Sequence, residues 1–209
     1  DGTSVGPESV VSIAAVLRER ALQPDVDRVS NNSLGVRLDW SNKQVSDDDV
    51  GRLIGALRRN HTLTDILLQG NGNVSDASIN RLATAVGGPC AVVRVNLDNT
   101  GVTNAAKNKL ARSLDLRRLS AFDAHLTKID WSTGDVSHAE LTRLVDALED
   151  PRSVVEELDL RNNRDLADGD PLLALVRVRA AKTAEAIHKA GGKLLLSIRL
   201  RGTSISDQV

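Results

Sequence analysis

A short apolar pattern that recurs at nearly constant spacing constrains this chain more than any other feature. Six segments contain two apolar residues separated by one residue, which is typical of a strand with one buried face. The six pairs are Leu38/Trp40, Ile66/Leu68, Val95/Leu97, Ile129/Trp131, Leu158/Leu160 and Ile198/Leu200. Their first members lie 28, 29, 34, 29 and 40 residues apart. This spacing predicts a repeat protein with insertions near 115–125 and 168–192.

Helical patterns follow the strands. After every strand pattern except the fifth, an apolar residue precedes a Ser or Thr, whose hydroxyl can cap a helix N-terminus. These capping residues are Ser46, Ser75, Thr103, Ser137 and Ser206. Glu140, three residues after Ser137, predicts a capping box. Apolar residues then fall at helical spacing and predict one buried face per helix. In the three clearest units they are Val50, Leu53, Ile54, Leu57; Ile79, Leu82, Ala83, Val86; and Leu141, Leu144, Val145, Leu148.

The longest internal match supports the same unit. The segment 37–41 reads Arg-Leu-Asp-Trp-Ser, and the segment 128–132 reads Lys-Ile-Asp-Trp-Ser. Each is followed at equal distances by Val-Ser and then by Arg-Leu, so the two stretches are 91 residues apart throughout. A match of this length indicates that the chain repeats one structural unit rather than a chance pattern.

Strand followed by helix, repeated, predicts an α/β fold with parallel strands and right-handed connections. Helices on one side only would curve the sheet into a solenoid, with strands on the concave side and helices on the convex side. Apolar residues at helical spacing in 8–22 predict an N-terminal capping helix that buries Val10, Ile13, Ala14, Leu17 and Ala21. We therefore expect one domain over 1–209, with about six repeats over 34–209.

The repeat resembles a known class. Its length and apolar pattern resemble the leucine-rich repeats of ribonuclease-inhibitor-like proteins. Residues 29–39, with Val-Ser-Asn-Asn-Ser-Leu before the first strand, and residues 56–63, Ala-Leu-Arg-Arg-Asn-His-Thr-Leu, resemble the repeat domain of tropomodulin and leiomodin. The resemblance implies a non-enzymatic, cytoplasmic module that binds a protein, with actin or another cytoskeletal protein as the expected partner. It identifies no individual site residue.

Residues between the buried strand positions would face the concave surface. They form a polar stripe that is mainly acidic and becomes basic toward the C-terminus. From this stripe we predict a protein-binding site of Asp39, Asn96, Asp130, Asp159, Arg161 and Arg199. The alternative is a solvated surface on which side chains pair across neighbouring strands, such as Arg94 with Asp65. The stripe holds no aromatic residue, although aromatic residues and Arg dominate most interface hot spots.

Composition narrows the function classes. The chain contains two Trp, one Phe and no Tyr, so the core must be aliphatic, with both Trp residues filling core positions. A net charge of −1 gives no field that favours nucleic acid or an anionic membrane, and no apolar run is long enough to span a bilayer. Cys90 is the single cysteine, excludes an intrachain disulfide and favours a reducing compartment. The expected state is a monomer or a part of a larger protein.

The sequence offers little support for an enzymatic function. The four histidines show no metal-ligand spacing, and no cofactor motif occurs. The nearest approach to a catalytic pair is Asp123 with His125. A second hypothesis is a regulator of a small GTPase, because the GTPase-activating protein of nuclear transport has similar repeats and acts through loops on one rim. The corresponding rim residues here would be Asn42, Asn71, Asn99 and the run 162–164, although turn asparagines are expected in any such repeat.

Overall fold

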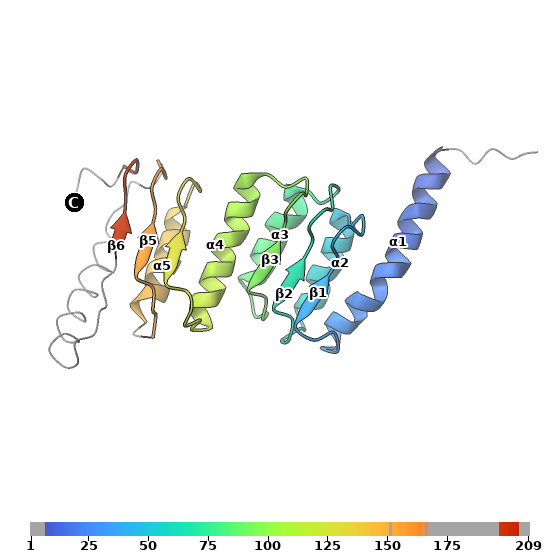
Figure 1. Cartoon of the computed structure of the whole chain (residues 1–209), viewed down its shortest axis with the longest axis horizontal. Helices are drawn as coiled ribbons and strands as arrows, with labels where there is room; N and C mark the ends of the chain where they lie inside the picture. Colours follow the sequence, from blue (N-terminus) through green and yellow to red (C-terminus); the bar gives the residue numbers. More distant parts are fainter. Residues whose placement is uncertain (1–6, 151, 165, 167–196, 205–209) are drawn as a thin grey trace, which may run out of the picture. The chain divides into compact units, whose positions relative to one another are not determined.

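The computed structural model describes residues 7–150, 152–164, 166 and 197–204, with side chains from residue 15 onward. Short strands alternate with helices, and the chain divides into two compact units, residues 1–114 and 115–209 (Figure 1). The expected insertion at 168–192 and the expected helix cap Ser206 lie outside the described residues. None of the described helices is both long enough and apolar enough to cross a membrane.

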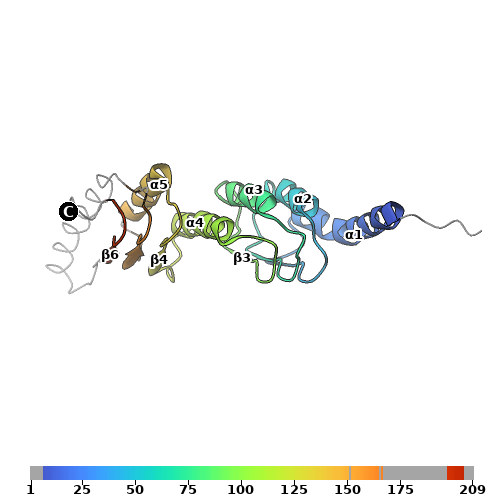
Figure 2. The ribbon, with the colours of Figure 1, turned by 90° about the horizontal axis from the view of Figure 1, so that it is seen from above.

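Unit 1 is a parallel three-stranded sheet with helices on one side. Its elements are α1 (Pro7–Ser30), β1 (Arg37–Asp39), α2 (Asp47–Leu57), β2 (Asp65–Leu67), α3 (Asp76–Val86), β3 (Arg94–Asn96) and the first part of α4 (Asn104–Ser120). The strand order is β1-β2-β3, and Leu38, Ile66 and Val95 are partners in register. Figure 2 shows α2 and α3 on the same side of this sheet. The opposite side therefore exposes the strand side chains between the buried positions.

Unit 2 repeats this plan. It contains the end of α4, β4 (Lys128–Asp130), α5 (His138–Glu149), β5 (Glu157–Asp159) and β6 (Ser197–Arg199), with all three strands parallel in the order β4-β5-β6. The predicted parallel pairing is confirmed, but a single six-stranded sheet is not, because the six described strands form two sheets. The separation falls at α4, which has 17 residues where α2 and α3 have 11. The insertion expected near 115–125 is the extension of this helix and the turn after it.

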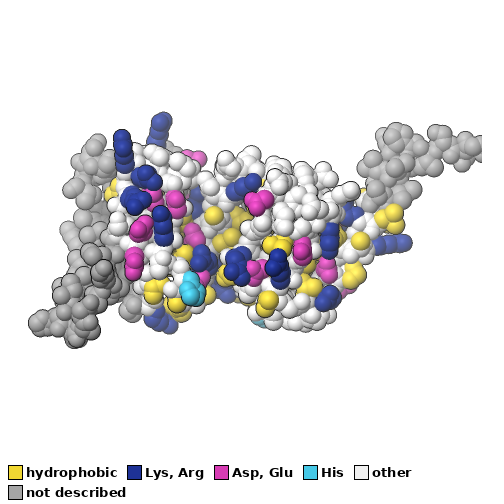
Figure 3. Space-filling model, viewed as in Figure 1, with side chains coloured by type: hydrophobic (Ala, Val, Ile, Leu, Met, Phe, Trp, Pro, Cys, Tyr) yellow, Lys and Arg dark blue, Asp and Glu magenta, His cyan; other side chains and the backbone are white. Residues whose placement is uncertain are grey.

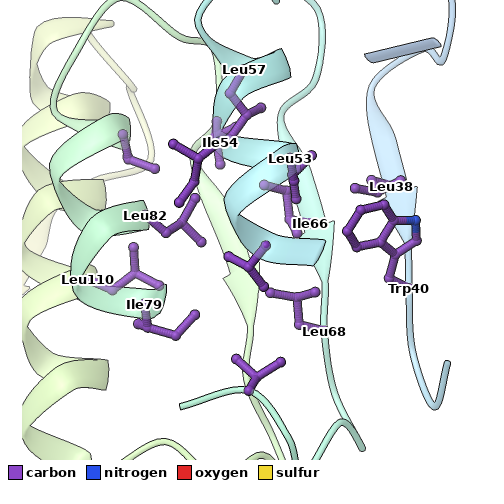
Figure 4. Close-up of a cluster of buried hydrophobic side chains, with 14 of the residues drawn as sticks. Leu38, Trp40, Leu53, Ile54, Leu57, Ile66, Leu68, Ile79, Leu82 and Leu110 are labelled. Carbon is purple, nitrogen blue, oxygen red and sulfur yellow. The ribbon is translucent and has the colours of Figure 1, made fainter. Parts of the chain in front are cut away.

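The predicted helix faces form the cores. In unit 1 the strand residues Leu38, Trp40, Ile66 and Leu68 are at most 1% exposed, and they pack against α2 and α3 (Figure 4). Every apolar residue predicted for the inner faces of α2, α3 and α5 is buried. The unit 2 core follows the same rule, with Ile129 and Trp131 buried against α5. These cores are almost entirely aliphatic, as the composition required.

The helix caps do more than the sequence predicted. The expected capping box is present, because Ser137 N donates to Glu140 Oε2 at 3.0 Å and Glu140 N donates to Ser137 Oγ at 3.3 Å. In unit 1 the first residue of a helix also accepts two hydrogen bonds from the cap of the next helix. Asp47 accepts from the backbone N and the Oγ of Ser75, at 2.8 and 2.5 Å. An acid in the first turn favours the helix dipole, and here it also links consecutive helices.

The N-terminal helix differs from its prediction. It extends to Ser30 rather than ending near residue 22, and its core contacts come from Leu22, Val26 and Val29. Leu17, predicted to face the core, is 60% exposed. Within the described part of the chain, α1 packs against one helix, α2, whereas α2 packs against two. The apolar residues of α1 therefore do not define the buried face as strictly as those of the internal helices.

Candidate functional site

The strand face of unit 1 carries one exposed and well-oriented carboxylate, that of Asp39. Its Oδ1 accepts hydrogen bonds from Ser41 N at 3.0 Å and from Ser41 Oγ at 2.6 Å. These bonds favour the ionised form and lower the pKa of Asp39 below its usual value. Among the described residues, Asp39 Oδ2 accepts no hydrogen bond, so an incoming donor can reach it.

Unit 2 presents the same arrangement at Asp130. Its Oδ1 accepts from Ser132 N at 3.1 Å and from Ser132 Oγ at 2.6 Å, and the side chain is exposed. Figure 3 shows acidic and basic side chains mixed on the strand-side surface. The two units thus carry the same exposed Asp-x-Ser element, whose aspartates are two of the residues predicted to bind a partner.

Asp159 occupies a different environment from the other predicted acids. Its carboxylate is buried at 2% exposure and accepts from Arg161 Nε at 2.9 Å and Arg161 Nη2 at 2.7 Å. Arg199 Nη1 lies 3.8 Å from the same carboxylate. The hydrogen bonds from Arg161 hold the pKa of Asp159 below its usual value. Asp159 is therefore placed to orient Arg161 and Arg199, whose guanidinium groups are the exposed ones.

Other charges on the strand face pair with each other. Arg94 holds Asp65 through two contacts, Nε to Oδ1 at 2.5 Å and Nη2 to Oδ2 at 3.2 Å. Lys128 Nζ lies 3.5 Å from Glu157 Oε2. The Arg94–Asp65 pair was expected from the alternative of a solvated face with pairing across strands. Such exposed pairs contribute little stability, about 0–1 kcal/mol each.

Asn96, the remaining predicted site residue, is half-buried on β3. Its Oδ1 accepts from Asp98 N at 2.8 Å, which uses the amide oxygen within its own turn. The structure thus places Asp39 and Asn96 on the sheet of unit 1, and Asp130 and Asp159 on the sheet of unit 2. Nothing in the geometry assigns Asn96 more than a turn-stabilising role.

The rim asparagines are structural where the structure describes their contacts. Asn71 is fully buried, accepts from Val45 N at 2.9 Å and donates to Trp40 O at 2.8 Å and Leu68 O at 2.7 Å. Asn163 makes the matching contacts in unit 2. The others adopt left-handed turn conformations, with φ of 55° at Asn42, 54° at Asn99 and 61° at Asn162. Asparagine tolerates this region better than most residues, which explains these positions without catalysis.

Both tryptophans fill core positions, and each has a partner that the sequence did not reveal. Trp40 Nε1 donates to Asp25 Oδ2 at 3.0 Å, and Trp131 Nε1 donates to Asp115 Oδ2 at 3.0 Å. Each acid lies on the helix that precedes its strand, 15 or 16 residues away. No short sequence pattern connects residues at that distance, so only the packing of helix on strand shows the pair.

The residues considered for catalysis or metal binding have structural contacts. Asp123 accepts from His125 N at 2.9 Å and from Arg118 Nε at 2.8 Å, so its carboxylate closes a turn. Cys90 is buried, and its Sγ lies 3.8 Å from Val86 O. Within the described ranges, no three His, Cys, Asp or Glu side chains gather in a way that could hold a metal ion.

Comparison with known proteins leaves the family open. No protein-family model and no curated protein matches the sequence. Among solved structures, the chain is similar to leiomodin-1 actin-binding site 2 (ABS2), at 13% identity, over 80% of this chain and 92% of that one, with a TM-score of 0.41. At that TM-score the likeness does not establish a shared fold, and membership of the tropomodulin and leiomodin family stays a prediction.

Proposed function

We propose that this chain is a non-enzymatic protein-binding module, a right-handed leucine-rich-repeat solenoid that binds its partner through the strand side. The observation that carries the proposal is the repeated Asp-x-Ser element. Asp39 and Asp130 are both exposed, and both are held by a serine two residues later through the same oxygen. An oriented carboxylate loses less conformational freedom on binding than a mobile one, so its pairing with a partner costs less entropy.

The charges suggest the chemistry of the partner surface. Asp39 and Asp130 suit Lys or Arg on the partner, whereas Arg161 and Arg199 suit carboxylates. The residues predicted to bind on the strand side are charged or polar, and none is aromatic. We therefore expect modest affinity that falls as the salt concentration increases. Asn96 and Asp159 would stabilise this proposed surface rather than contact the partner. The side chain of Asn96 accepts a hydrogen bond from Asp98 N, and that of Asp159 accepts one from Arg161 Nε.

Actin is the first partner to test, in a cytoplasmic and cytoskeletal setting. This part of the proposal rests on the sequence resemblance of residues 29–39 and 56–63 to the repeat domain of tropomodulin and leiomodin. The alternative function, stimulation of a small GTPase, receives no support from the rim asparagines, because Asn71 and Asn163 are buried and bonded to backbone. A direct measurement of actin binding therefore comes first.

The test is co-sedimentation with filamentous actin, together with elongation at pointed filament ends. We expect the unmodified chain to bind, and a D39K/D130K double variant to bind about tenfold more weakly, because two attractive charges become repulsive. D146K is the matched control, since Asp146 is exposed on α5 and the charge change is of the same kind. If the unmodified chain does not bind, actin is excluded as the partner. If the double variant binds equally well, the strand side is not the binding surface.

A further inference from the structure

A second surface lies on the helix side of unit 1, where α2 and α3 leave a groove between their C-terminal ends. Its volume is about 440 Å³. Ile54, Leu57 and Cys90 line it and are each at most 7% exposed, so the floor is apolar. The strand-side residues discussed above do not line it. The groove is therefore independent of the function proposed above.

Two glycines on α2 leave space beside this groove. Gly51 and Gly55 are four residues apart and so lie on one side of the helix. A Cβ at Gly55 would meet no atom within 4 Å, and a Cβ at Gly51 would meet only the guanidinium of Arg81, at 3.5 Å. Both backbones lie outside the left-handed region that favours glycine. Neither packing within the chain nor backbone geometry therefore requires glycine, which is a poor helix former.

The equivalent helix of unit 2 shows that the fold tolerates side chains at these positions. With the 91-residue offset of the repeat, α5 carries Thr142 and Asp146 where α2 carries Gly51 and Gly55. Both positions of α5 are helical, so the helix forms without glycine there. The open space on α2 therefore has no counterpart at the same positions of α5. It allows another chain to approach α2 more closely than any side chain would permit.

The charge at the groove has one sign. Arg58 and Arg81 line it and are exposed, and its lining contains no carboxylate. Within the described ranges, neither guanidinium lies within 4 Å of a carboxylate, and the electrostatic partner of Arg81 on these elements is Asp47, whose pKa Arg81 helps to lower. The position equivalent to Arg58 in unit 2 is Glu149, so the end of α5 does not carry this positive charge. An apolar floor with a basic rim is complementary to a segment that is aliphatic on one face and acidic on the other.

We propose that the groove between α2 and α3 binds an acidic amphipathic helix of a partner protein. Aliphatic side chains of that helix would occupy the floor over Ile54 and Leu57. Its carboxylates would pair with Arg58 and Arg81, and its backbone would pass close to α2 at Gly55. Guanidinium–carboxylate pairs at the edge of a desolvated apolar contact give orientation as well as affinity.

The test uses a synthetic fluorescein-labelled peptide of about 14 residues, roughly four helical turns, with Leu on one face and Glu on the other. Fluorescence anisotropy measures its binding to the full chain. We expect micromolar affinity, and binding about tenfold weaker or worse when every Glu of the peptide is replaced by Lys. No detectable binding of the Glu peptide would overturn the proposal.

Variants of the chain then locate the site. R58E/R81E should weaken binding about tenfold or more by reversing the rim charge, whereas R59E, which changes an exposed neighbour outside the groove, should not. G55L should also weaken binding about tenfold by filling the open space, with an unchanged or higher melting temperature because leucine favours the helix. Equal binding to G55L, or an equal loss with R59E, would show that the peptide binds elsewhere.

Discussion

Both units hold a buried tryptophan by a hydrogen bond to an aspartate, and we call this pair the Trp–Asp anchor. The charges around the aspartate differ between the two units. In each, a buried Trp directly after the first strand donates its indole N–H to an Asp on the preceding helix, at 3.0 Å. In unit 1, Arg28 Nη1 lies 3.8 Å from Asp25 Oδ1, and Lys43 Nζ lies 3.8 Å from Asp25 Oδ2. In unit 2 the position of Lys43 is taken by Gly134. Asp115 therefore has one nearby cation, Arg118, at 3.9 Å.

Asp115 has a raised pKa. Its pKa is raised to about 6, mainly because the carboxyl group is buried and to a smaller extent because of the charge of nearby Asp130. The hydrogen bond from Trp131 and the charge of Arg118 act in the opposite direction but do not offset burial. The side chains of the two acids are similarly exposed, 22% for Asp25 and 19% for Asp115, but only Asp25 has a lysine within 4 Å. Equal geometry thus does not imply equal stability contributions.

The turns that follow α1 and α4 diverge in a related way. Asn32, at φ of 61°, donates to Arg59 O at 3.1 Å and accepts from His61 N at 2.8 Å, which fastens it to the next turn. Phe122 occupies the matching turn of unit 2, at φ of 55°, and the guanidinium of Arg152 lies 3.5 Å from its ring centroid. A cation–π contact therefore stands where unit 1 uses hydrogen bonds. Repeats of one fold can close the same turn with different chemistry.

The largest expected effect on stability comes from removing the buried asparagine that makes the same hydrogen bonds in each unit. Asn71→Ala and Asn163→Ala should each lower the free energy of unfolding by about 3 kcal/mol, because each leaves several buried backbone groups unpaired. Urea denaturation followed by circular dichroism measures both. Asn99→Ala is the control, since Asn99 is exposed in a turn, and its expected loss is at most about 1 kcal/mol. A large inequality between the two buried variants would show that the asparagines support their units differently.

The sequence predicted the buried faces best for helices that lie between two neighbouring elements. The faces of α2, α3 and α5 are all correct because an internal helix has one direction in which to bury its apolar side chains. The capping helix was predicted less well, since Leu17 and Ala21 are exposed. The division into two sheets also escaped prediction, because the spacing of strand patterns carries no information on which neighbours pair.

The candidate site was predicted in part for a similar reason. Strand alternation correctly placed Asp39 and Asp130 on the exposed side. It could not reveal that Arg161 covers Asp159 and leaves it 2% exposed, because long side chains cover neighbours two residues away. It also could not reveal the Trp–Asp anchors, which depend on how a helix crosses a strand rather than on local spacing. Whether these surface residues bind a partner stays a prediction.

The second prediction concerns the acid that distinguishes the two anchors. Asp115→Asn should stabilise the chain at pH 7.5 by about 1–3 kcal/mol, because a pKa raised by about two units corresponds to roughly 3 kcal/mol. An amide removes the buried charge and keeps an oxygen that can accept from Trp131 Nε1. Urea denaturation at a series of pH values measures the gain. The matched variant in unit 1, Asp25→Asn, should instead be neutral or destabilising by up to about 0.5 kcal/mol, because it loses its contacts with Lys43 and Arg28.

The pH dependence of that gain has a defined sign. The folded-state pKa of Asp115, about 6, lies above its ordinary value of 3.8. Between these values the folded state binds a proton that the unfolded chain does not bind, so the unmodified chain gains stability from this group as pH falls. Asp115→Asn lacks that contribution, and its advantage should therefore shrink below pH 6 and vanish near pH 4. An advantage that persists unchanged to pH 4 would contradict the assignment to Asp115.

The smallest expected effect on stability comes from giving the Trp–Asp anchor of unit 2 the lysine that unit 1 has. Gly134→Lys places in unit 2 the cation that Lys43 supplies in unit 1, and the backbone of Gly134 lies outside the left-handed region that favours glycine. We expect a gain of about 0.5 kcal/mol relative to Gly134→Gln, which makes the same backbone change without the charge. The pKa of Asp115, followed by carbon NMR of its carboxyl group, should fall below 6 in the lysine variant only, and less at high salt. If both variants leave that pKa unchanged, burial alone sets the ionisation of Asp115, and the missing lysine does not explain how the two units differ.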